Sequence, residues 1–323
     1  MILVTGVTGA LSSLILAGLT ALGDVEVVAG SRSGDGTTTR RIDFDDPASL
    51  VDGFAGVDAL VFVSAGYAED DVVLARHGAV VDAAAAAGVR HVIYTSLAGS
   101  GDALTIALPH RWTETRLAAA PFDVTVLRNA LYAEIPAGLA IAGAESAAAT
   151  GVFAAALGAG RVSVVARQDL ADVAVRVAAE TERDLAAGKG GLTPARSRHA
   201  GRTYELEGVT AIGGEDIAAI LTRALDRPVE YRPMSLFETR QALAGSGLEP
   251  YQVGHTISLL STVGAGLLVA GATDLTDLLA AEPRPVCDLI ADAVPAGGYG
   301  SASAPLRPGV EPSAIKGDDV PGW

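Results

Sequence analysis

The amino-acid sequence predicts a doubly wound α/β fold, in which helices cover both faces of a parallel sheet. Through the first half of the chain, short runs of aliphatic and β-branched residues alternate with longer segments whose apolar positions recur at helical spacing. A glycine-rich turn joins the first of these runs directly to a helix. The runs are nearly continuous in apolar residues, which is typical of strands buried on both faces of a parallel sheet.

We expect six strands in this region, separated by Ala/Leu-rich helices such as residues 71–87. The strands are predicted at residues 2–4, 25–29, 41–44, 59–63, 92–94 and 124–127. Half of the residues are hydrophobic but only 5% are aromatic, so the core should consist mainly of Ala, Val and Leu. A chain of 323 residues is long enough for one large domain or two modest ones.

The turn after the first strand has the features of a dinucleotide site. Gly6 allows a tight turn, and Gly9 has no side chain to keep the backbone away from a pyrophosphate. The helix that begins near Gly9 then directs unpaired N–H groups and its positive dipole end at that phosphate. Ser12 stands where a third glycine is usual, which predicts a slightly displaced helix. We expect the pyrophosphate to contact Gly6, Val7, Thr8, Gly9, Ala10 and Leu11.

The residue that follows the second strand favours NADPH over NADH. In NAD-binding versions of the fold an Asp or Glu ends this strand, whereas here the strand runs into Arg32, which can hold a 2′-phosphate through charge-assisted hydrogen bonds. The alternative for Arg32 is a solvated loop residue. Asp43 and Phe44 end the third strand, where a carboxylate and a backbone amide can meet the adenine; Asp43 could instead cap the next helix. Ser64 and Ala65 are small residues where the cofactor must pass.

After about residue 130 the pattern loosens. A strand at 162–165 and a helix from 169 to about 183 are expected to return to the main sheet, and 188–202 is expected to be an exposed loop. A strand, a helix, a short strand and a mostly helical remainder are then predicted at residues 204–206, 215–225, 229–231 and up to about 294. This second region is expected to form a smaller cap over the cofactor cleft.

The domain division follows from these elements. We expect a Rossmann-type dinucleotide-binding domain at residues 1–185, of which about 131–160 contribute to the cap. A substrate and cap region with one strand returning to the sheet is predicted at 186–294. Residues 295–323 contain 5 Pro and 6 Gly with no apolar period, and they predict an extended tail.

The net charge and the cysteine content limit the kinds of molecule and site that we expect for this protein. The formal net charge of −15 disfavours a nucleic acid or an anionic membrane, and the single cysteine, Cys287, excludes an internal disulfide. No targeting segment is apparent, and residues 257–272 are too short for a membrane span. No His, Asp and Glu cluster has the spacing of a metal site. We therefore expect a cytoplasmic protein with a small-molecule substrate and no metal.

Several stretches together resemble the NmrA-like branch of the atypical short-chain dehydrogenase/reductases, and within it the NADPH:quinone oxidoreductases. The similarity covers roughly residues 1 to 290. It implies NADPH binding and hydride transfer, and a homodimer is compatible with it although no residue demands one. The matching stretches are residues 4–11, 43–44, 86–96, 110–115, 127–129 with Tyr132 and Glu134, and 168–171.

The catalytic residues of the parent superfamily are only partly present. That superfamily uses a serine with a Tyr-x-x-x-Lys pair; Ser96 matches the serine, but His110 and Glu114 occupy the spacing of the pair. His110 and Glu114 share one helix face, so Glu114 could orient His110 as a proton donor near neutral pH. The alternative for His110 is a contact with the cofactor or the cap. Tyr94 is expected to face away from Ser96 and to belong to the core.

The absence of the Tyr-x-x-x-Lys pair favours one class of hydride acceptor. Reduction of a ketone makes a strongly basic alkoxide and needs a positioned acid, whereas a quinone gives a delocalised and much less basic hydroquinone anion. A site without the tyrosine and lysine pair is therefore easier to reconcile with a quinone or another conjugated carbonyl. Hydride should leave the nicotinamide directly, because no flavin motif is apparent.

Further candidates end the sixth strand and enter the cap. Asn129 could contact the nicotinamide ribose or the substrate at the carboxyl edge of the sheet. Tyr132, Glu134 and His255 could line the substrate pocket. Asn129, Tyr132 and Glu134 could equally be structural ties, and for His255 a satisfied, partly buried histidine is the favoured alternative. His77 and His91 are expected to be structural.

Two other functions stay open. NmrA-like proteins include non-catalytic NADP(H)-binding redox sensors, and the missing tyrosine and lysine pair suits such a regulator equally well. A biosynthetic ketone or imine reductase is the alternative within the same enzyme class.

Overall fold

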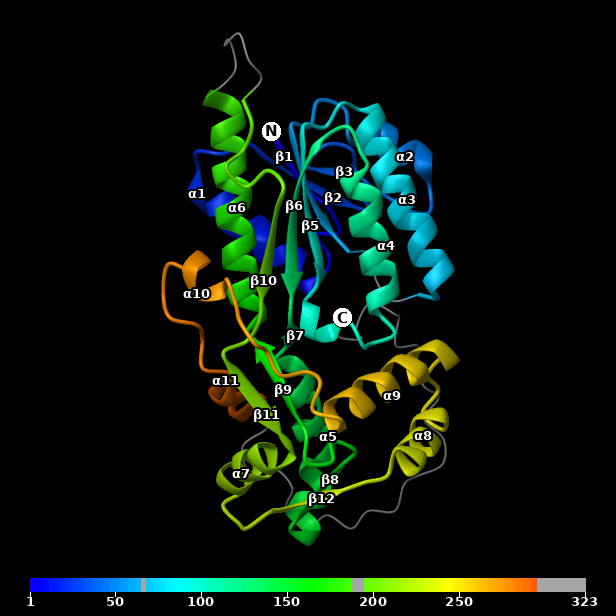
Figure 1. Cartoon of the computed structure of the whole chain (residues 1–323), viewed down its shortest axis with the longest axis vertical. Coiled ribbons are helices and arrows are strands. Elements are labelled where there is room, and N and C mark those ends of the chain that lie inside the picture. Colours follow the sequence, from blue (N-terminus) through cyan, green and yellow to red (C-terminus); the bar gives the residue numbers. More distant parts are fainter. Residues whose placement is uncertain (65–67, 188–194, 295–323) are drawn as a thin grey trace. The chain divides into compact units, whose positions relative to one another are not determined.

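The protein divides into two compact units, which we describe separately. The computed structural model describes residues 1–64, 68–187 and 195–294. The first unit consists of Met1–Leu131, Val165–Val209 and Ala270–Arg284, and the second of Tyr132–Val164, Thr210–Val269 and the chain from Pro285 onward. Both units are thus assembled from separate stretches of sequence (Figure 1).

The first unit is built on a seven-stranded sheet in which every strand is parallel to its neighbours. Its order is β3-β2-β1-β4-β5-β6-β10, so the strand order reverses at β1, next to the glycine-rich turn. The predicted doubly wound parallel sheet is confirmed. The strands are β1 (Ile2–Val4), β2 (Val27–Ser31), β3 (Thr39–Arg41), β4 (Ala59–Val63), β5 (His91–Leu97), β6 (Asp123–Asn129) and β10 (Arg202–Leu206).

Helices cover both faces of this sheet (Figure 1). One face carries α2 (Pro47–Gly53), α3 (Asp70–Ala86) and α4 (Ala107–Ala118), and the other carries α1 (Ala10–Leu22) and α6 (Arg167–Ala187). On the first face the core is a continuous cluster that includes the fully buried Phe54, Phe62 and Tyr94. On the second face Gly18 of α1 lies so close to Val175 of α6 that an added Cβ would meet the valine at 2.6 Å.

A buried carboxylate ties the last segment of the first unit to α6. Asp169 is 1% exposed and accepts hydrogen bonds from the backbone N and from Nη1 of Arg284. Nearby, Asp274 accepts from the backbone N of Glu205 at 2.8 Å, just before the short helix α10 (Leu275–Leu278). These contacts explain why residues 270–284 pack with the first unit although the chain has already passed through the second.

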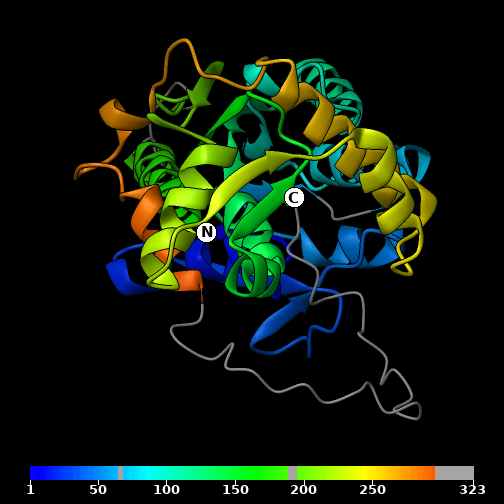
Figure 2. The same cartoon turned by 90° about the horizontal axis from the view of Figure 1, so that it is seen from below.

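The second unit contains more β-structure than the mostly helical region expected from the sequence. Its strands form one sheet of order β11-β9-β7 and one pair, β12-β8. Figure 2 shows α8 and α9, drawn in yellow, packed side by side. The elements are β7 (Leu131–Tyr132), α5 (Glu134–Thr150), β8 (Val152–Ala155), β9 (Arg161–Val165), β11 (Thr210–Gly213), α7 (Gly214–Ala224), β12 (Glu230–Pro233), α8 (Leu236–Ala244), α9 (Pro250–Gly264) and α11 (Val286–Ala293).

Some element predictions need correction. The strand predicted at 162–165 is β9, which pairs antiparallel with β11 and does not join the main sheet. The strand that does return is β10, which pairs parallel with β6. Helix α9 ends at Gly264, so the apolar run at 257–272 is helical only in its first half. In the described part of the predicted loop at 188–202, Ser197 and His199 are buried, because His199 hydrogen-bonds Tyr204 and Glu180.

Candidate functional site

The glycine-rich turn between β1 and α1 is open to a ligand. Gly6 has φ +64°, a left-handed conformation that a residue with a side chain rarely adopts. An added Cβ on Gly9 would meet the Gly6 carbonyl oxygen at 3.2 Å, so the second glycine keeps the turn tight. Gly6, Thr8, Gly9 and Ala10 are exposed, whereas the strand before them is fully buried.

The first turn of α1 fits an anionic group. Gly9 is the N-cap, no side chain caps it, and the first turn holds no acidic residue, so its N–H groups and dipole are left for a ligand. Ser12 is 1% exposed, and the position that a Gly6 Cβ would occupy lies 3.7 Å from its hydroxyl. The serine is thus packed beneath the turn. These observations fit the pyrophosphate of a dinucleotide.

Arg32 follows β2 and is exposed near the carboxyl edge of the sheet. Its positive charge acts on Asp45, whose pKa is lowered mainly by a two-point hydrogen bond from Arg76 and in smaller part by Arg32. Asp43 and Phe44 lie just beyond the end of β3, which is shorter than predicted. The Phe44 ring packs edge-on against Phe62, with centroids 5.7 Å apart.

The helix that follows Asp43 has a different residue at its N-cap. Asp46 is the N-cap of α2 and Pro47 follows it, which is a favoured position for proline at a helix start. The Asp43 side chain instead accepts from the backbone N of Asp45 at 3.1 Å. Asp43 therefore does not cap the next helix and remains a candidate for adenine contact.

An ion network lies on the α4 face at the carboxyl ends of β5 and β6. Ser96 Oγ donates to Glu114 Oε1 at 2.5 Å, and Arg111 Nη1 donates to the same oxygen at 2.8 Å. Arg128 donates to Glu114 through Nε and Nη2, at 3.0 and 2.6 Å. Arg128 Nη1 also donates to Glu205 Oε1 at 2.8 Å, and Glu205 Oε2 accepts from the backbone N of Gly99.

The acidic and basic groups of this network stay ionised at neutral pH. Burial of Glu114 favours its neutral form, but hydrogen bonds from Arg128 and Ser96 outweigh burial and lower the pKa of the carboxyl. The hydrogen bond to Glu114 raises the pKa of Arg128 above its already high usual value. Glu114 is therefore an anion held by two arginines, and Ser96 is bound to it as a donor.

Sequence reasoning missed three members of this network. Arg111, Arg128 and Glu205 were not identified as site residues, although Arg111 and Arg128 stand next to predicted ones. The sequence signal is weak: charged residues at a strand end or in the first turns of a helix are usually solvated. Glu205 lies 77 positions beyond its partner Arg128, and only the pairing of β10 with β6 brings them together.

His110 has a different partner from the one predicted. Tyr94 Oη and His110 Nδ1 are 2.9 Å apart, whereas Glu114 is held by Ser96 and the arginines, so the expected orientation of His110 by Glu114 is wrong. Burial lowers the pKa of His110 to about 4. The ring is therefore neutral near neutral pH, and its expected role as a proton donor stays a prediction.

Tyr94 is in the core as predicted, with 0% exposure, but its predicted direction is wrong. Tyr94 contacts His110 and Ser96 contacts Glu114, and both partners lie on α4. The physical reason is the period of two along a strand: residues 94 and 96 share a face, and only neighbours in sequence point to opposite faces.

The remaining candidates of the first unit lie at the ends of β4 and β6. Asn129 is 6% exposed and its Oδ1 is buried without a hydrogen-bond partner among the described residues, as a group that awaits a ligand would be. The backbone N of Ser64 donates to Thr95 Oγ1 at 3.1 Å. Ala65 lies outside the described residues.

The three predicted pocket residues belong to the second unit. Tyr132 lies in β7, Glu134 begins α5, and His255 lies in α9 with its ring edge-on to Tyr251 at 6.0 Å. The structure does not bring these three together with the ion network in one unit.

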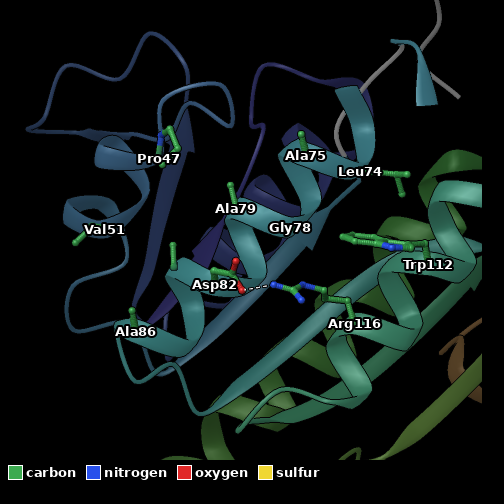
Figure 3. A pocket seen from close by; sticks show the side chains of 11 residues that line it. Pro47, Val51, Leu74, Ala75, Gly78, Ala79, Asp82, Ala86, Trp112 and Arg116 are labelled. Atoms are coloured by element: carbon green, nitrogen blue, oxygen red, sulfur yellow. Dashed lines mark hydrogen bonds and ion pairs between the residues drawn. The ribbon is translucent and has the colours of Figure 1, made fainter. Parts of the chain in front are cut away.

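A separate apolar groove of about 700 Å³ lies on the outer surface of α2, α3 and α4 (Figure 3). Small residues of α3 form its floor, Trp112 forms one wall, and an ion pair between Asp82 and Arg116 at 2.7 Å closes one side. None of the predicted site residues lines this groove.

Among the described residues, no three His, Cys, Asp or Glu side chains are grouped as a metal ion requires, and no helix is long and apolar enough to cross a bilayer.

His77 and His91 are buried and paired within the fold, as expected of structural residues. His77 Nδ1 lies 2.7 Å from Thr113 Oγ1, and His91 Nε2 lies 2.8 Å from Thr125 Oγ1. Each histidine thus joins two elements of the first unit, α3 to α4 and β5 to β6.

Comparison with known proteins agrees with the geometry of the turn. The model of a family described as NAD(P)H-binding matches residues 6–181. Quinone oxidoreductase 2 of Escherichia coli is 33% identical over 258 residues, which cover 77% of this chain and 82% of that protein.

Two crystal structures resemble most of this chain. Triphenylmethane reductase of Citrobacter sp. in complex with NADP(H) has a TM-score of 0.77 at 26% identity, covering 91% of this chain and 99% of the other. NADPH-dependent quinone oxidoreductase of Escherichia coli in complex with NADPH has a TM-score of 0.74 at 28% identity, covering 90% and 99%. The chain therefore belongs to the NAD(P)H-binding family and is an NAD(P)H-dependent oxidoreductase.

Proposed function

We propose that the protein is an NADPH-dependent reductase that transfers hydride to a quinone or a related conjugated carbonyl. The observation that carries the proposal is the bond from Ser96 Oγ to Glu114 at 2.5 Å. In the parent superfamily this serine would assist a carbonyl, whereas here Ser96 donates a hydrogen bond to the Glu114 carboxylate. The names of the quinone and dye reductases that this chain resembles support the same class of acceptor.

The chemistry of the acceptor follows from this bond. A ketone becomes a strongly basic alkoxide when it accepts hydride, so its reduction depends on a nearby acid. A quinone becomes a delocalised hydroquinone anion, which is far less basic and can take its proton from water. In this site Ser96 already donates to Glu114, and Arg111 and Arg128 balance the negative charge of Glu114. Such a site is suited to the second reaction.

Residues of the first unit would hold the cofactor. The N–H groups at the start of α1 would bind the pyrophosphate, with Gly6 and Gly9 keeping the backbone close, and the Arg32 guanidinium would bind the 2′-phosphate. Asn129 Oδ1, which has no hydrogen-bond partner among the described residues, would accept a hydrogen bond from the carboxamide or ribose of the nicotinamide. When bound, the reduced nicotinamide supplies the hydride. The remaining residues proposed for this role are Val7, Thr8, Ala10, Leu11, Asp43, Phe44, Ser64 and Ala65.

The acceptor would be a small molecule, and we keep the cytoplasm as the proposed location. Tyr132, Glu134 and His255 stay candidates for contacts with the acceptor from the second unit. A homodimer stays a prediction.

The proposal is tested by following NADPH and NADH oxidation at about 340 nm with and without 1,4-naphthoquinone, together with binding titrations of both cofactors. We expect quinone-dependent loss of NADPH, much faster than loss of NADH. The variant Gly9→Val should abolish both binding and turnover, because its side chain would crowd the turn against the Gly6 carbonyl.

The second candidate is a redox sensor that binds NADP(H) without turnover. The same bond between Ser96 and Glu114 favours it, because a sensor needs no acid at all. Tight NADPH binding with no oxidation by naphthoquinone, benzoquinone or an azo dye would support the sensor. A ketone or imine reductase is less compatible with the bond, and turnover of a simple ketone at a rate equal to that of a quinone would favour it instead.

A further inference from the structure

Tyr94 and His110 form a buried pair between the middle of β5 and the first turns of α4. The tyrosine is 0% exposed, and its Oη lies 2.9 Å from Nδ1 of the partly buried histidine. Their rings are 6.0 Å apart and tilted by 42°. The hydrogen bond occupies Nδ1, and no hydrogen bond to Nε2 is found among the described residues.

The direction of this hydrogen bond follows from acid strength. Burial raises the pKa of the Tyr94 hydroxyl, so the hydroxyl keeps its proton, and burial lowers the pKa of His110 to about 4, so the ring is neutral. A phenol O–H is a better donor than an imidazole N–H, and an unprotonated imidazole nitrogen is a better acceptor than a phenol oxygen. On these grounds Tyr94 is the expected donor to Nδ1, with the ring proton on Nε2.

The surrounding groups are compatible with this arrangement. The charges that act on His110 are those of Arg111 and Glu114, from its own helix. Across from it on α3, His77 is fully buried and lies 2.7 Å from Thr113, a neighbour of the pair on α4. A hydrogen bond with the Ser64 side chain reaches Tyr94 from the end of β4, so the pair adjoins the edge where the cofactor is proposed to bind.

We propose that Tyr94 is a positioning residue that holds His110 in the Nε2–H tautomer, from which Nε2–H donates a hydrogen bond to an oxygen of the quinone. The inference rests on the proposed function and goes further, because it assigns how His110 acts. The nicotinamide gives up a hydride, the quinone accepts it as a two-electron reduction, and negative charge grows on the quinone oxygen. His110 stabilises this charge and keeps its proton, and the hydroquinone anion takes a proton from water.

The tautomer can be read without any activity. Two-dimensional ¹H–¹⁵N NMR of protein labelled with ¹⁵N-histidine distinguishes Nε2–H from Nδ1–H, and the His110 signals are identified by their loss in His110→Gln. We expect the Nε2–H pattern in the wild type at about pH 7 and a mixture of tautomers in Tyr94→Phe. An Nδ1–H pattern in the wild type would overturn the proposal, whether or not the protein reduces quinones.

Kinetics then test the link to the reaction. Tyr94→Phe should lower kcat for naphthoquinone about 10-fold, as expected for the loss of one hydrogen bond, with little change in the KM for NADPH. In the His110→Gln background, whose amide places a donor near the Nε2 position without needing Tyr94, the same substitution should change kcat less than about 2-fold. An equal loss in both backgrounds would mean that Tyr94 acts only through packing, and would refute the inference.

The chain contains a matched control. Tyr204 Oη lies 2.8 Å from His199 Nδ1, a buried tyrosine–histidine pair of the same kind on the opposite face of the sheet. Tyr204→Phe should leave kcat and the His110 signals unchanged. A wild-type enzyme that fails to oxidise NADPH with any quinone would refute the proposed function, while the NMR result would still decide the tautomer.

Discussion

At the scale of single residues, Arg32 provides the positive charge expected to select the cofactor. It is exposed beyond β2 and already acts on Asp45 through its charge. Arg32→Glu should weaken NADPH binding about 10- to 100-fold, because it replaces a charge-assisted contact with repulsion, and should leave NADH binding nearly unchanged. Titration of both cofactors measures the effect. Arg240→Glu, the same charge change on the exposed surface of α8, should alter neither affinity, and an equal loss for both cofactors would contradict the role of Arg32.

The pH dependence of turnover reports the state of His110. The pKa of this residue is lowered to about 4 by burial, so the ring is neutral at every pH well above that value. We therefore expect kcat to stay level between about pH 5.5 and 8, because the ring does not change its charge over this range. A fall centred near pH 6.5 would mean that His110 titrates as an exposed histidine does.

At the scale of elements, the packing of α1 on α6 depends on one glycine. A Cβ on Gly18 would meet Val175 Cγ2 at 2.6 Å, closer than two carbons can approach. Gly18→Ala should therefore lower the melting temperature, since an overpacking cost of about 1–3 kcal/mol exceeds the gain of about 1 kcal/mol in helix propensity. Thermal unfolding followed by circular dichroism measures the change.

Two variants accompany this test. Adding Val175→Ala to Gly18→Ala should recover part of the lost melting temperature, because it removes the methyl group that the new Cβ meets. Gly254→Ala in α9, where an added Cβ meets nothing within 4 Å, should be neutral or stabilising by up to about 1 kcal/mol. Equal effects at Gly18 and Gly254 would show that helix propensity, and not contact between the helices, decides the result.

The elements of the first unit follow closely from local sequence, and those of the second unit do not. Strands β1 and β4 are apolar throughout, and β5 and β6 contain the apolar and β-branched runs 92–94 and 124–127, so their positions can be predicted from the sequence. The strand at 161–165 has the same local pattern, yet it pairs with β11 and not with the main sheet. Local pattern identifies a strand, whereas the partner of a strand depends on where the rest of the chain leads it.

At the scale of the whole molecule, buried histidines link stability to pH. His77 and His91 are both 0% exposed, and burial lowers their pKa values to about 3 and about 4, whereas in the unfolded chain both have ordinary values near 6.5. The unfolded state therefore binds more protons below pH 6.5. The stability that these residues contribute is complete above that pH and is lost as the pH falls toward their folded values.

This linkage predicts a measurable loss in mild acid. Between pH 7 and 5, each of the two histidines should reduce the free energy of unfolding by about 2 kcal/mol. Urea unfolding at both pH values tests this. His77→Asn keeps a donor toward Thr113 but cannot titrate, so its stability should fall less than that of the wild type. The free energy of unfolding of His255→Gln, a change at a partly exposed residue, should fall with pH as that of the wild type does. An equal fall between pH 7 and 5 in the wild type and in His77→Asn would contradict the prediction.

The candidate site was predictable in its cofactor half and much less so in its catalytic half. Residues 6–11 are consecutive, and their turn and helix follow from a glycine spacing that can be read locally. Glu114 was placed beside His110 because the two share a helix face, but it contacts Arg128 of a strand that follows the helix. Tyr94 was assigned the wrong face, although the period of a strand was enough to place it correctly.

The sequence by itself determined the doubly wound sheet, the glycine turn and the preference for a nicotinamide cofactor, because each depends on residues close together in the chain. Only the tertiary structure decided which charges pair, which sheet each later strand joins, and that His110 is held neutral by burial and bonded to Tyr94. The physical reason is distance along the chain. Desolvation and ion pairing depend on every group packed around a side chain, and residues 77 positions apart, as Arg128 and Glu205 are, meet only after the sheet has formed.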